Sequence, residues 1–219
     1  MRQVLAGVVA AMGDRLDAFA VQQLALATYK SKDLEPVKAL TDAQAILTPL
    51  DPEGANDPET LGLWGAIHKR LAERPERSAE QQKADLDTAI FAYEKGYYLK
   101  DDYYNGINLA FLLDTRAAKE QGDDRIADRV QARRVRERLA RRVEQQIAER
   151  EGKETTKELQ EEGYWMRATL AEAHAGLGDT AGEREWIEKA RAFTPESWMV
   201  STTQEQIGKL RKLLEAAAD

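Results

Sequence analysis

Two stretches of the chain, residues 63–99 and residues 170–195, place small and large side chains in the same order. Small residues that alternate with large ones at fixed helical spacing allow two helices to nest closely. Each stretch therefore predicts a helix, a turn and a second helix that packs back onto the first. The shared positions are Trp64, Gly65, His68, Ala89, Ile90, Tyr93, Gly96 and Leu99 in the first stretch, and Leu170, Ala171, His174, Gly178, Asp179, Ile187, Ala190 and Pro195 in the second.

The offsets in the second stretch resemble those of the tetratricopeptide repeat, a helix–turn–helix unit of about 34 residues. The first stretch departs from that repeat because it holds extra residues between its two helices. Stacked helix pairs of this kind expose a long groove and carry no reactive groups of their own. The resemblance implies an all-α fold, an irregular tetratricopeptide-like α-solenoid of about four helix pairs plus terminal helices. It also favours a binding module over an enzyme.

The rest of the chain shows the same helical pattern between breaks at glycine and proline. No segment alternates apolar and polar residues with period two, so we expect essentially no β-sheet. Asp57 precedes Pro58 and is predicted to cap the helix that begins there. The predicted helices cover residues 2–12, 16–30, 36–47, 58–73, 79–100, 103–119, 125–151, 156–176, 181–192 and 202–217.

These helices are expected to form one helical-repeat domain over residues 1–219. Within it, residues 1–15 form an N-terminal helix, residues 16–195 the repeat array and residues 196–219 a C-terminal capping helix. The prediction follows from the length, which suits one elongated repeat domain.

Composition limits what such a chain can bind. A formal net charge of −7 argues against general binding to nucleic acid, which requires a basic surface to displace counterions from phosphates. The chain has no cysteine, so disulfides, thiolate metal sites and cysteine nucleophiles are excluded. No apolar run reaches the roughly 18 residues that span a bilayer, and the apolar residues in 4–12 fit one helix face better than a signal peptide. We therefore expect a cytoplasmic protein without nucleic-acid or membrane partners.

The titratable residues form no pattern typical of catalysis or metal binding. His68 and His174 are the only histidines, and neither has a ligand-type partner three or four residues away. Both occupy a repeat position usually filled by tyrosine, which favours packing. Glu158, Glu161 and Glu162 fit a solvated helix face with ion pairs between successive turns. We predict no catalytic residue, no cofactor and no metal site.

Residues 125–151 form the only basic stretch. Acidic residues offset much of its charge, and apolar residues at helical spacing form one stripe. We favour a packed, solvated helix over a site for an anion, nucleic acid or an acidic partner, and an acidic protein fits better than DNA. The arginines are Arg125, Arg129, Arg133, Arg134, Arg136, Arg138, Arg141, Arg142 and Arg150, the acids Asp124, Asp128, Glu137, Glu144 and Glu149, and the stripe Ile126, Val130, Val135, Leu139, Val143 and Ile147.

A more specific resemblance rests on segments spread over residues 22–214. They read DPETLGL from residue 57, GAIHK from residue 65, DYYNGINLA from residue 102 and YW at residue 164. Their order resembles the TRAFs-binding region, the tetratricopeptide-like central regulatory domain of the apoptosis signal-regulating kinases and of bacterial relatives. The family's Arg-Ile-Tyr-Lys becomes Ala-Ile-His-Lys here, and residues 104–113 are the most specific part.

This resemblance implies the regulatory half of such proteins alone, because the chain lacks the glycine-rich loop and the catalytic motifs of a kinase. In the eukaryotic kinases the region binds adaptors and couples them to activation. The bacterial relatives resemble sensor or adaptor modules near signalling or defence effectors. The identity of the partner, signal or effector does not transfer to this chain.

The first helix of each repeat pair lines the concave face, so counting from the repeat positions predicts which residues contact a partner. Aromatic and arginine side chains supply most of the binding energy in protein interfaces, and an asparagine can hold a peptide backbone. The alternative is that the aromatic residues among them pack against a neighbouring pair. The predicted groove residues are Gln22, Tyr29, Lys69, Arg70, Tyr104, Asn108, Phe111 and Trp165.

Three functions stay open at this point. The leading hypothesis is a non-enzymatic interaction and regulatory scaffold that holds a partner peptide or domain in a helical-repeat groove, in a signalling or defence assembly. The second is a small-ligand sensor or enzyme subunit with a site buried between helices, which a ligand-dependent rise in melting temperature would favour. The third is a structural module that self-associates into a homo-oligomer.

Overall fold

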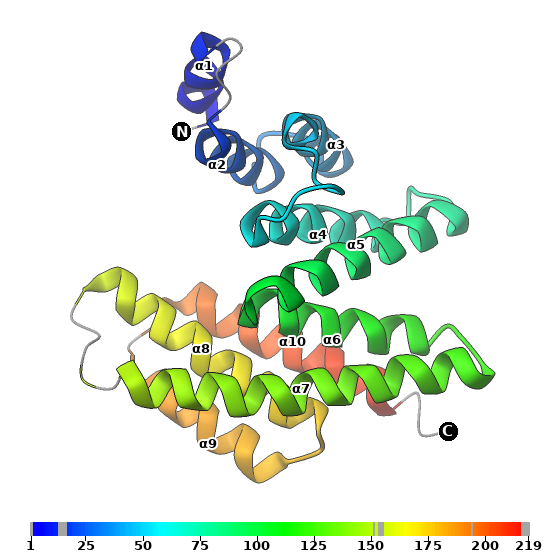
Figure 1. The fold of residues 1–219 in the computed structure, drawn as a ribbon, viewed down its shortest axis with the longest axis vertical. Coiled ribbons are helices and arrows are strands. Elements are labelled where there is room, and N and C mark those ends of the chain that lie inside the picture. The colour runs from blue at the N-terminus through cyan, green and yellow to red at the C-terminus, as the bar shows by residue number, and fades with distance from the viewer. Residues whose placement is uncertain (1, 13–16, 151, 153–155, 194, 216–219) are drawn as a thin grey trace. The chain divides into compact units, whose positions relative to one another are not determined.

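The structure is a computed structural model that describes residues 2–12, 17–150, 152, 156–193 and 195–215 (Figure 1). Within these residues every regular element is helical, which confirms the all-α prediction. No helix in this part of the chain is long and apolar enough to cross a membrane. The elements are α1 (Arg2–Met12), α2 (Ala18–Tyr29), α3 (Pro36–Leu47), the short 3-10 helix η1 (Thr48–Leu50), α4 (Pro58–Ala72), α5 (Ala79–Lys100), α6 (Tyr103–Ala117), α7 (Gly122–Arg150), α8 (Lys157–Gly176), α9 (Thr180–Arg191) and α10 (Ser197–Glu215).

The predicted helix boundaries agree with these within a few residues, with larger differences at two helix starts. Helix α7 begins at Gly122 because Asp123 and Asp124 occupy its first turn, where acidic side chains favour a helix N-terminus. Helix α10 begins at Ser197 and buries Met199 in its first turn. The predicted helix ends at residues 16, 151 and 217 fall outside the described residues.

The chain separates into two compact units, residues 1–105 and residues 106–219. The prediction of one repeat domain with boundaries after residues 15 and 195 stays a prediction. In the first unit α2 pairs with α3, α4 pairs with α5, and α4 also contacts both helices of the preceding pair. Helix α1 packs on α2. This sequential pairing of neighbours is the arrangement expected of helical repeats.

The core of the first unit lies between α2, α3 and α4. Its second helix pair closes tightly at Gly65, because a Cβ atom there would lie 3.0 Å from the ring of Tyr93 on α5. Tyr93 is fully buried in consequence. The buried core residues are Val21, Ala25, Leu40, Ala43, Leu47, Leu63, Ile67 and Leu71.

Helix α1 forms where the sequence predicts it, but its apolar face is only partly covered. Leu5 and Val9 are half-buried, and Val9 packs against the core of the first unit. Val4 and Val8 are 71% and 42% exposed. The side chain of Met12, which was predicted on the same face, falls outside the described residues.

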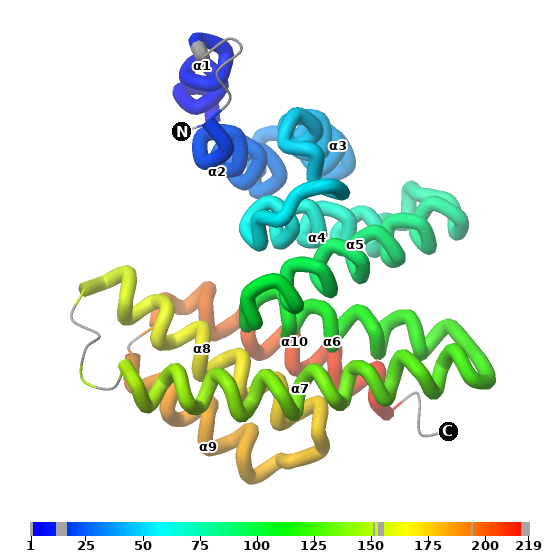
Figure 2. The backbone as a smooth tube through the Cα atoms, in the orientation of Figure 1, coloured from blue at the N-terminus to red at the C-terminus, as the bar shows by residue number. Residues whose placement is uncertain are grey.

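In the second unit α8 is the central helix and packs against α7, α9 and α10 (Figure 2). One part of its core joins α8, α9 and α10 through aromatic and small side chains. Those residues are Tyr164, Ala168, Ala190 and Met199, with Trp165 and Phe193 packed against them.

The apolar stripe predicted for α7 is buried only in part. The four C-terminal members of the stripe are buried, whereas Ile126 and Val130 are 60% and 42% exposed. One arginine of the basic stretch is a core residue, because Arg136 is 1% exposed and its Nη1 lies 2.6 Å from the carboxylate of Asp114 on α6. Asp128 on the same helix is also buried, at 5% exposed, so the net charge of the exposed part of α7 is unchanged by the burial of Arg136.

Candidate functional site

The first unit brings aromatic and cationic side chains from four helices together. Tyr29 is the last residue of α2, Arg70 lies in the last turn of α4, Tyr93 lies on α5 and Tyr104 lies in the first turn of α6. We call these four residues the tyrosine–arginine cluster. Three of them, Tyr29, Arg70 and Tyr104, are among the predicted groove residues.

Ring contacts and one hydrogen bond fix the geometry of the cluster. The guanidinium carbon of Arg70 lies 4.9 Å from the centre of the Tyr29 ring, within the range of a cation–π interaction. Its Nη1 donates a hydrogen bond of 2.8 Å to the carbonyl oxygen of Ala66. The rings of Tyr93 and Tyr104 meet edge to face, with centres 6.1 Å apart. Tyr93 is 0% exposed and Tyr104 is 45% exposed, so the cluster reaches from the core to the surface.

Arg70 interacts electrostatically with all three phenols of the cluster. Burial raises the pKa of Tyr29 to about 12, with Tyr104 and Glu59 adding to the rise and Arg70 opposing it. Burial also raises the pKa values of Tyr93 and Tyr104, and Arg70 again opposes each rise. All three phenols therefore stay protonated at neutral pH and can donate hydrogen bonds.

Burial likewise raises the pKa of the nearby Glu59 carboxyl, to which the charges of Asp57 and Asp102 add. The acidic side chains near the cluster therefore raise the pKa of Glu59 and the pKa values of the Tyr29 and Tyr104 phenols.

The start of α6 is held in place by polar contacts that position Tyr104. The carboxylate of Asp102 accepts hydrogen bonds of 2.7 Å from both the backbone N–H and the side-chain amide of Asn105. That amide also donates to the carbonyl oxygen of Pro58 at the start of α4, at 3.3 Å. Glycines leave the space for this approach, because a Cβ atom at Gly96 would lie 2.8 Å from the Asn105 side chain. A Cβ atom at Gly62 on α4 would likewise lie 3.2 Å from Asn105 and 3.4 Å from the ring of Tyr104.

Gln22 has a structural role that corrects its predicted place on an open groove. It is 6% exposed, and its amide donates hydrogen bonds to the carboxylate of Asp57 at 2.6 Å and to the hydroxyl of Thr60 at 2.9 Å. Asp57 in turn accepts the backbone N–H of Thr60, which confirms the predicted cap of α4. Gln22 therefore ties α2 to the first turn of α4.

The other predicted groove residues are distributed over both units. Lys69 is half-buried in the first unit, next to Arg70 in sequence. Asn108 and Trp165 are half-buried in the second unit, where the Trp165 ring lies 5.1 Å from Tyr164 and 5.8 Å from Trp198, measured between ring centres. Phe111 is 3% exposed, which corrects the prediction that its side chain lines an open groove.

The sequence analysis did not predict Tyr93 as a member of the cluster or Lys30 as its neighbour. Tyr93 lies on the second helix of its pair, a position that the counting of first-helix residues leaves out. The glycine at residue 65 was the available signal, because a glycine facing a large residue of the partner helix marks a close approach. Lys30 follows α2 directly, and its ammonium nitrogen lies 6.0 Å from the centre of the Tyr29 ring.

His68 is a structural residue, in line with its predicted packing role. Its Nδ1 lies 2.8 Å from the carboxylate of Asp85, and the amide nitrogen of Gln44 lies 3.0 Å from its Nε2. Burial lowers the pKa of His68, although Asp85 opposes the change. The neutral ring thus donates to Asp85 and accepts from Gln44, which links α3, α4 and α5. Within the described residues no group of histidine, aspartate and glutamate could hold a metal ion.

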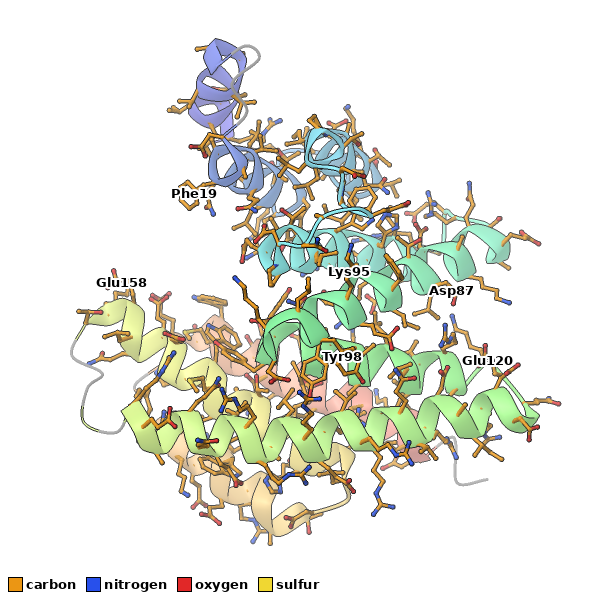
Figure 3. All side chains as sticks on the ribbon, in the orientation of Figure 1. Phe19, Asp87, Lys95, Tyr98, Glu120 and Glu158 are labelled. Atoms are coloured by element: carbon orange, nitrogen blue, oxygen red, sulfur yellow. The ribbon has the colours of Figure 1, made fainter. Side chains whose placement is uncertain are left out.

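Exposed aromatic residues also occur outside the cluster. Phe19 on α2 and Tyr98 on α5 are 69% and 54% exposed (Figure 3). Tyr98 lies against the neighbouring Tyr97 and is about as exposed as Tyr104. It is therefore a suitable reference for the effect of removing an exposed tyrosine from the first unit.

The family comparison matches the part of the chain that holds the cluster. A family model described as Tetratricopeptide Repeats-Sensor matches residues 1–113. The chain belongs to this family. The match confirms the tetratricopeptide prediction and indicates a helical-repeat module in a sensing or signalling context. Neither the curated proteins nor the solved structures contain a match to the chain.

The sensor-family match includes every residue of the tyrosine–arginine cluster and ends within α6. The cluster therefore lies entirely within the part of the chain that matches the sensor family. The cluster combines three phenols, their aromatic faces and one guanidinium group on four helices, of which α4 packs against α2 and α5.

Proposed function

We propose that the chain is a non-enzymatic recognition module that holds a segment of a partner protein against the tyrosine–arginine cluster. The observation that carries the proposal is the partial exposure of the cluster, with Tyr104 45% exposed and both Tyr29 and Arg70 half-buried. Tyrosine and arginine are the residues that most often dominate binding energy at protein interfaces. Here they come from helices whose positions are already fixed, so little ordering is required on binding.

The family match supports a signalling context for this module. In the finer form of the proposal, the chain acts as the regulatory region of a signalling or defence assembly, in the manner of the TRAFs-binding region of the apoptosis signal-regulating kinases. The support is the resemblance of residues 57–69 and 102–113 to that region. Of the cluster, these segments include Tyr104, and Arg70 directly follows the first of them.

The proposal is tested by quantitative retention of proteins from a lysate of the source cell. Wild-type chain is compared with Tyr104→Ala, and Tyr98→Ala is the matched control because it removes a tyrosine of similar exposure. A partner that the wild type and the control retain should be reduced about tenfold by Tyr104→Ala, the effect of losing roughly 1.4 kcal/mol. Equal retention by all three chains contradicts the assignment of the cluster as the binding site. Circular dichroism verifies that each variant keeps its helical content.

A second candidate is a small-ligand sensor, favoured by the family description and by the protonated phenols of the cluster. A ligand bound at the cluster stabilises the folded state by mass action and raises the melting temperature. The discriminating result is a rise in melting temperature with a metabolite extract from which proteins have been removed. If that rise is present in wild type and absent in Tyr104→Ala, the sensor is favoured over the protein-binding module.

A further inference from the structure

Two cations approach the same aromatic ring in the first unit. The ammonium nitrogen of Lys30 lies 6.0 Å, and the guanidinium carbon of Arg70 lies 4.9 Å, from the centre of the Tyr29 ring. They come from different helix pairs, because Lys30 caps the C-terminus of α2 and Arg70 lies at the end of α4. We call these two side chains the cation pair.

Neither member of the cation pair has an acidic partner among the described residues. Other basic side chains do form ion pairs there, including Lys38 with Asp42 and Arg77 with Asp85. Burial lowers the pKa of Lys30, and the charge of Arg70 lowers it further. Two like charges that share one ring without a counterion are costly to hold together. Two neighbouring basic side chains without an acidic partner are unusual in a chain whose net charge is −7.

One hydrogen bond holds the guanidinium of Arg70, and its other nitrogens keep N–H groups that can donate to a ligand. Its Nη1 donates to the carbonyl oxygen of Ala66, and its Nε and Nη2 make no hydrogen bond within the described residues. A planar guanidinium with one edge unused suits the two oxygens of a carboxylate. The protonated phenol of Tyr29 provides a further donor beside it.

We infer that the cation pair anchors the carboxylate of an acidic peptide segment in the partner protein. This inference rests on the proposed function, because it specifies the chemistry of the segment that the cluster holds. An incoming acidic segment supplies negative charge to a site where two cations approach one aromatic ring. A dianionic phosphate is less suited, because Glu59 and Asp102 also act on the phenols of the cluster and repel a second negative charge.

The test measures binding of fluorescein-labelled hexaglutamate to the full chain by fluorescence anisotropy at about 50 mM salt, where surface charges are only partly screened. Lys30→Gln and Arg70→Gln should each weaken binding about tenfold, which corresponds to roughly 1.4 kcal/mol. Arg133→Gln is the matched control, because it removes the same charge from an exposed arginine that is already paired with Glu137. Its affinity should stay within about twofold of wild type, since an exposed ion pair contributes little.

Three results would overturn the inference: equal affinity of wild type and both cation-pair variants, equal binding of labelled hexaglutamine, or complete competition by inorganic phosphate at the affinity of the peptide. The last result would assign a site for a small anion in place of an acidic peptide. Lys30 is exposed, so Lys30→Gln keeps the test valid if Arg70→Gln impairs folding.

The lysate experiment separates this inference from the proposed function. A partner that depends on Tyr104 but is retained equally by Lys30→Gln and Arg70→Gln supports the proposed function and overturns the inference. Hexaglutamate binding that depends on the cation pair, without any partner that depends on Tyr104, supports the inference and contradicts the proposed function.

Discussion

His68 shows how a single buried residue can contribute to stability in a pH-dependent way. Its ring is neutral because burial lowers its pKa below the ordinary value of 6.5. The unfolded chain therefore takes up a proton more readily than the folded chain as the pH falls. The stability that neutral His68 provides is present above about pH 6.5 and is lost as the pH drops through the folded-state pKa.

We expect His68→Gln to lower the free energy of unfolding by about 1–3 kcal/mol at pH 7, because Asp85 loses a buried partner. The difference between wild type and variant should narrow between pH 7 and pH 5, since only the wild type carries this protonation cost. Urea unfolding at several pH values measures both effects. A constant difference over that range would show that His68 is not held neutral.

Gly96 and Gly208 are both helical glycines, but they have opposite surroundings. A Cβ atom at Gly96 meets the Asn105 side chain at 2.8 Å, whereas nothing lies within 4 Å of one at Gly208. Gly96→Ala should therefore destabilise the chain by about 1–3 kcal/mol through overpacking. Gly208→Ala should stabilise it by roughly 0.5–1 kcal/mol, because alanine favours the helix. Denaturant unfolding compares the two, and a stabilising Gly96→Ala would refute the close approach.

At this scale the sequence identified which residues matter better than it identified their partners. The packing role of His68 followed from its repeat position, but Asp85 lies 17 residues away and its pairing depends on how α5 docks. The interior position of Arg136 was hidden for the same reason, since its partner Asp114 lies on another helix. Residue spacing within one helix does not determine contacts between helices.

At the scale of the element, local signals determined most of the helices. Asp57 illustrates this, because an aspartate before a proline predicts both the cap and the start of α4, and both are found. The cap also has a tertiary role, since the same carboxylate accepts the amide of Gln22 from α2.

Asp57→Ala should lower the free energy of unfolding by about 2–3 kcal/mol, because it removes the cap and leaves the buried Gln22 amide short of an acceptor. Glu35→Ala is the comparison. Glu35 caps α3 through the backbone N–H groups of Val37 and Lys38, and it is exposed. Its loss should cost only about 0.5–1 kcal/mol. Thermal or urea unfolding distinguishes the two, and equal costs would contradict the tertiary role of Asp57.

The face that each helix buries was harder to predict than its ends. Gln22 and Phe111 were expected to face the groove, yet both are buried. Neighbouring positions on a helix are separated by about 100°, so an error of one residue in counting from the repeat positions moves a side chain to another face. The extra residues in the first stretch and the length of α7 make such an error difficult to avoid.

For the molecule as a whole, charge predicts behaviour that no single helix shows. The chain carries a net charge of −7, and several arginines on or facing α7 are neutralised, among them Arg116 by Asp128 and Arg150 by Glu162. We expect no binding to a short DNA duplex at about 150 mM salt, because few counterions would be released. An electrophoretic mobility assay measures this, with a basic DNA-binding protein as positive control. A salt-dependent shift would reassign α7 as a nucleic-acid surface.

The sequence predicted an all-helical stack but not its division near residue 105. Helical periodicity reports which residues are apolar, whereas the division depends on where contacts between helices become sparse. No composition change marks that point, because it falls inside a continuous helix.

The boundary between the two compact units lies within α6, and this has a consequence for how the gene can be divided or recombined. The first turn of α6 supplies Tyr104 and Asn105 to one unit, and its last turns supply Asp114 and Arg116 to the other. A break after residue 105 would leave Asn105 at a fraying end, where its bonds to Asp102 and Pro58 could not hold. Recombination between homologous genes at the turn after residue 117 would keep α6 whole and leave the contacts of Asn105 within one parental segment.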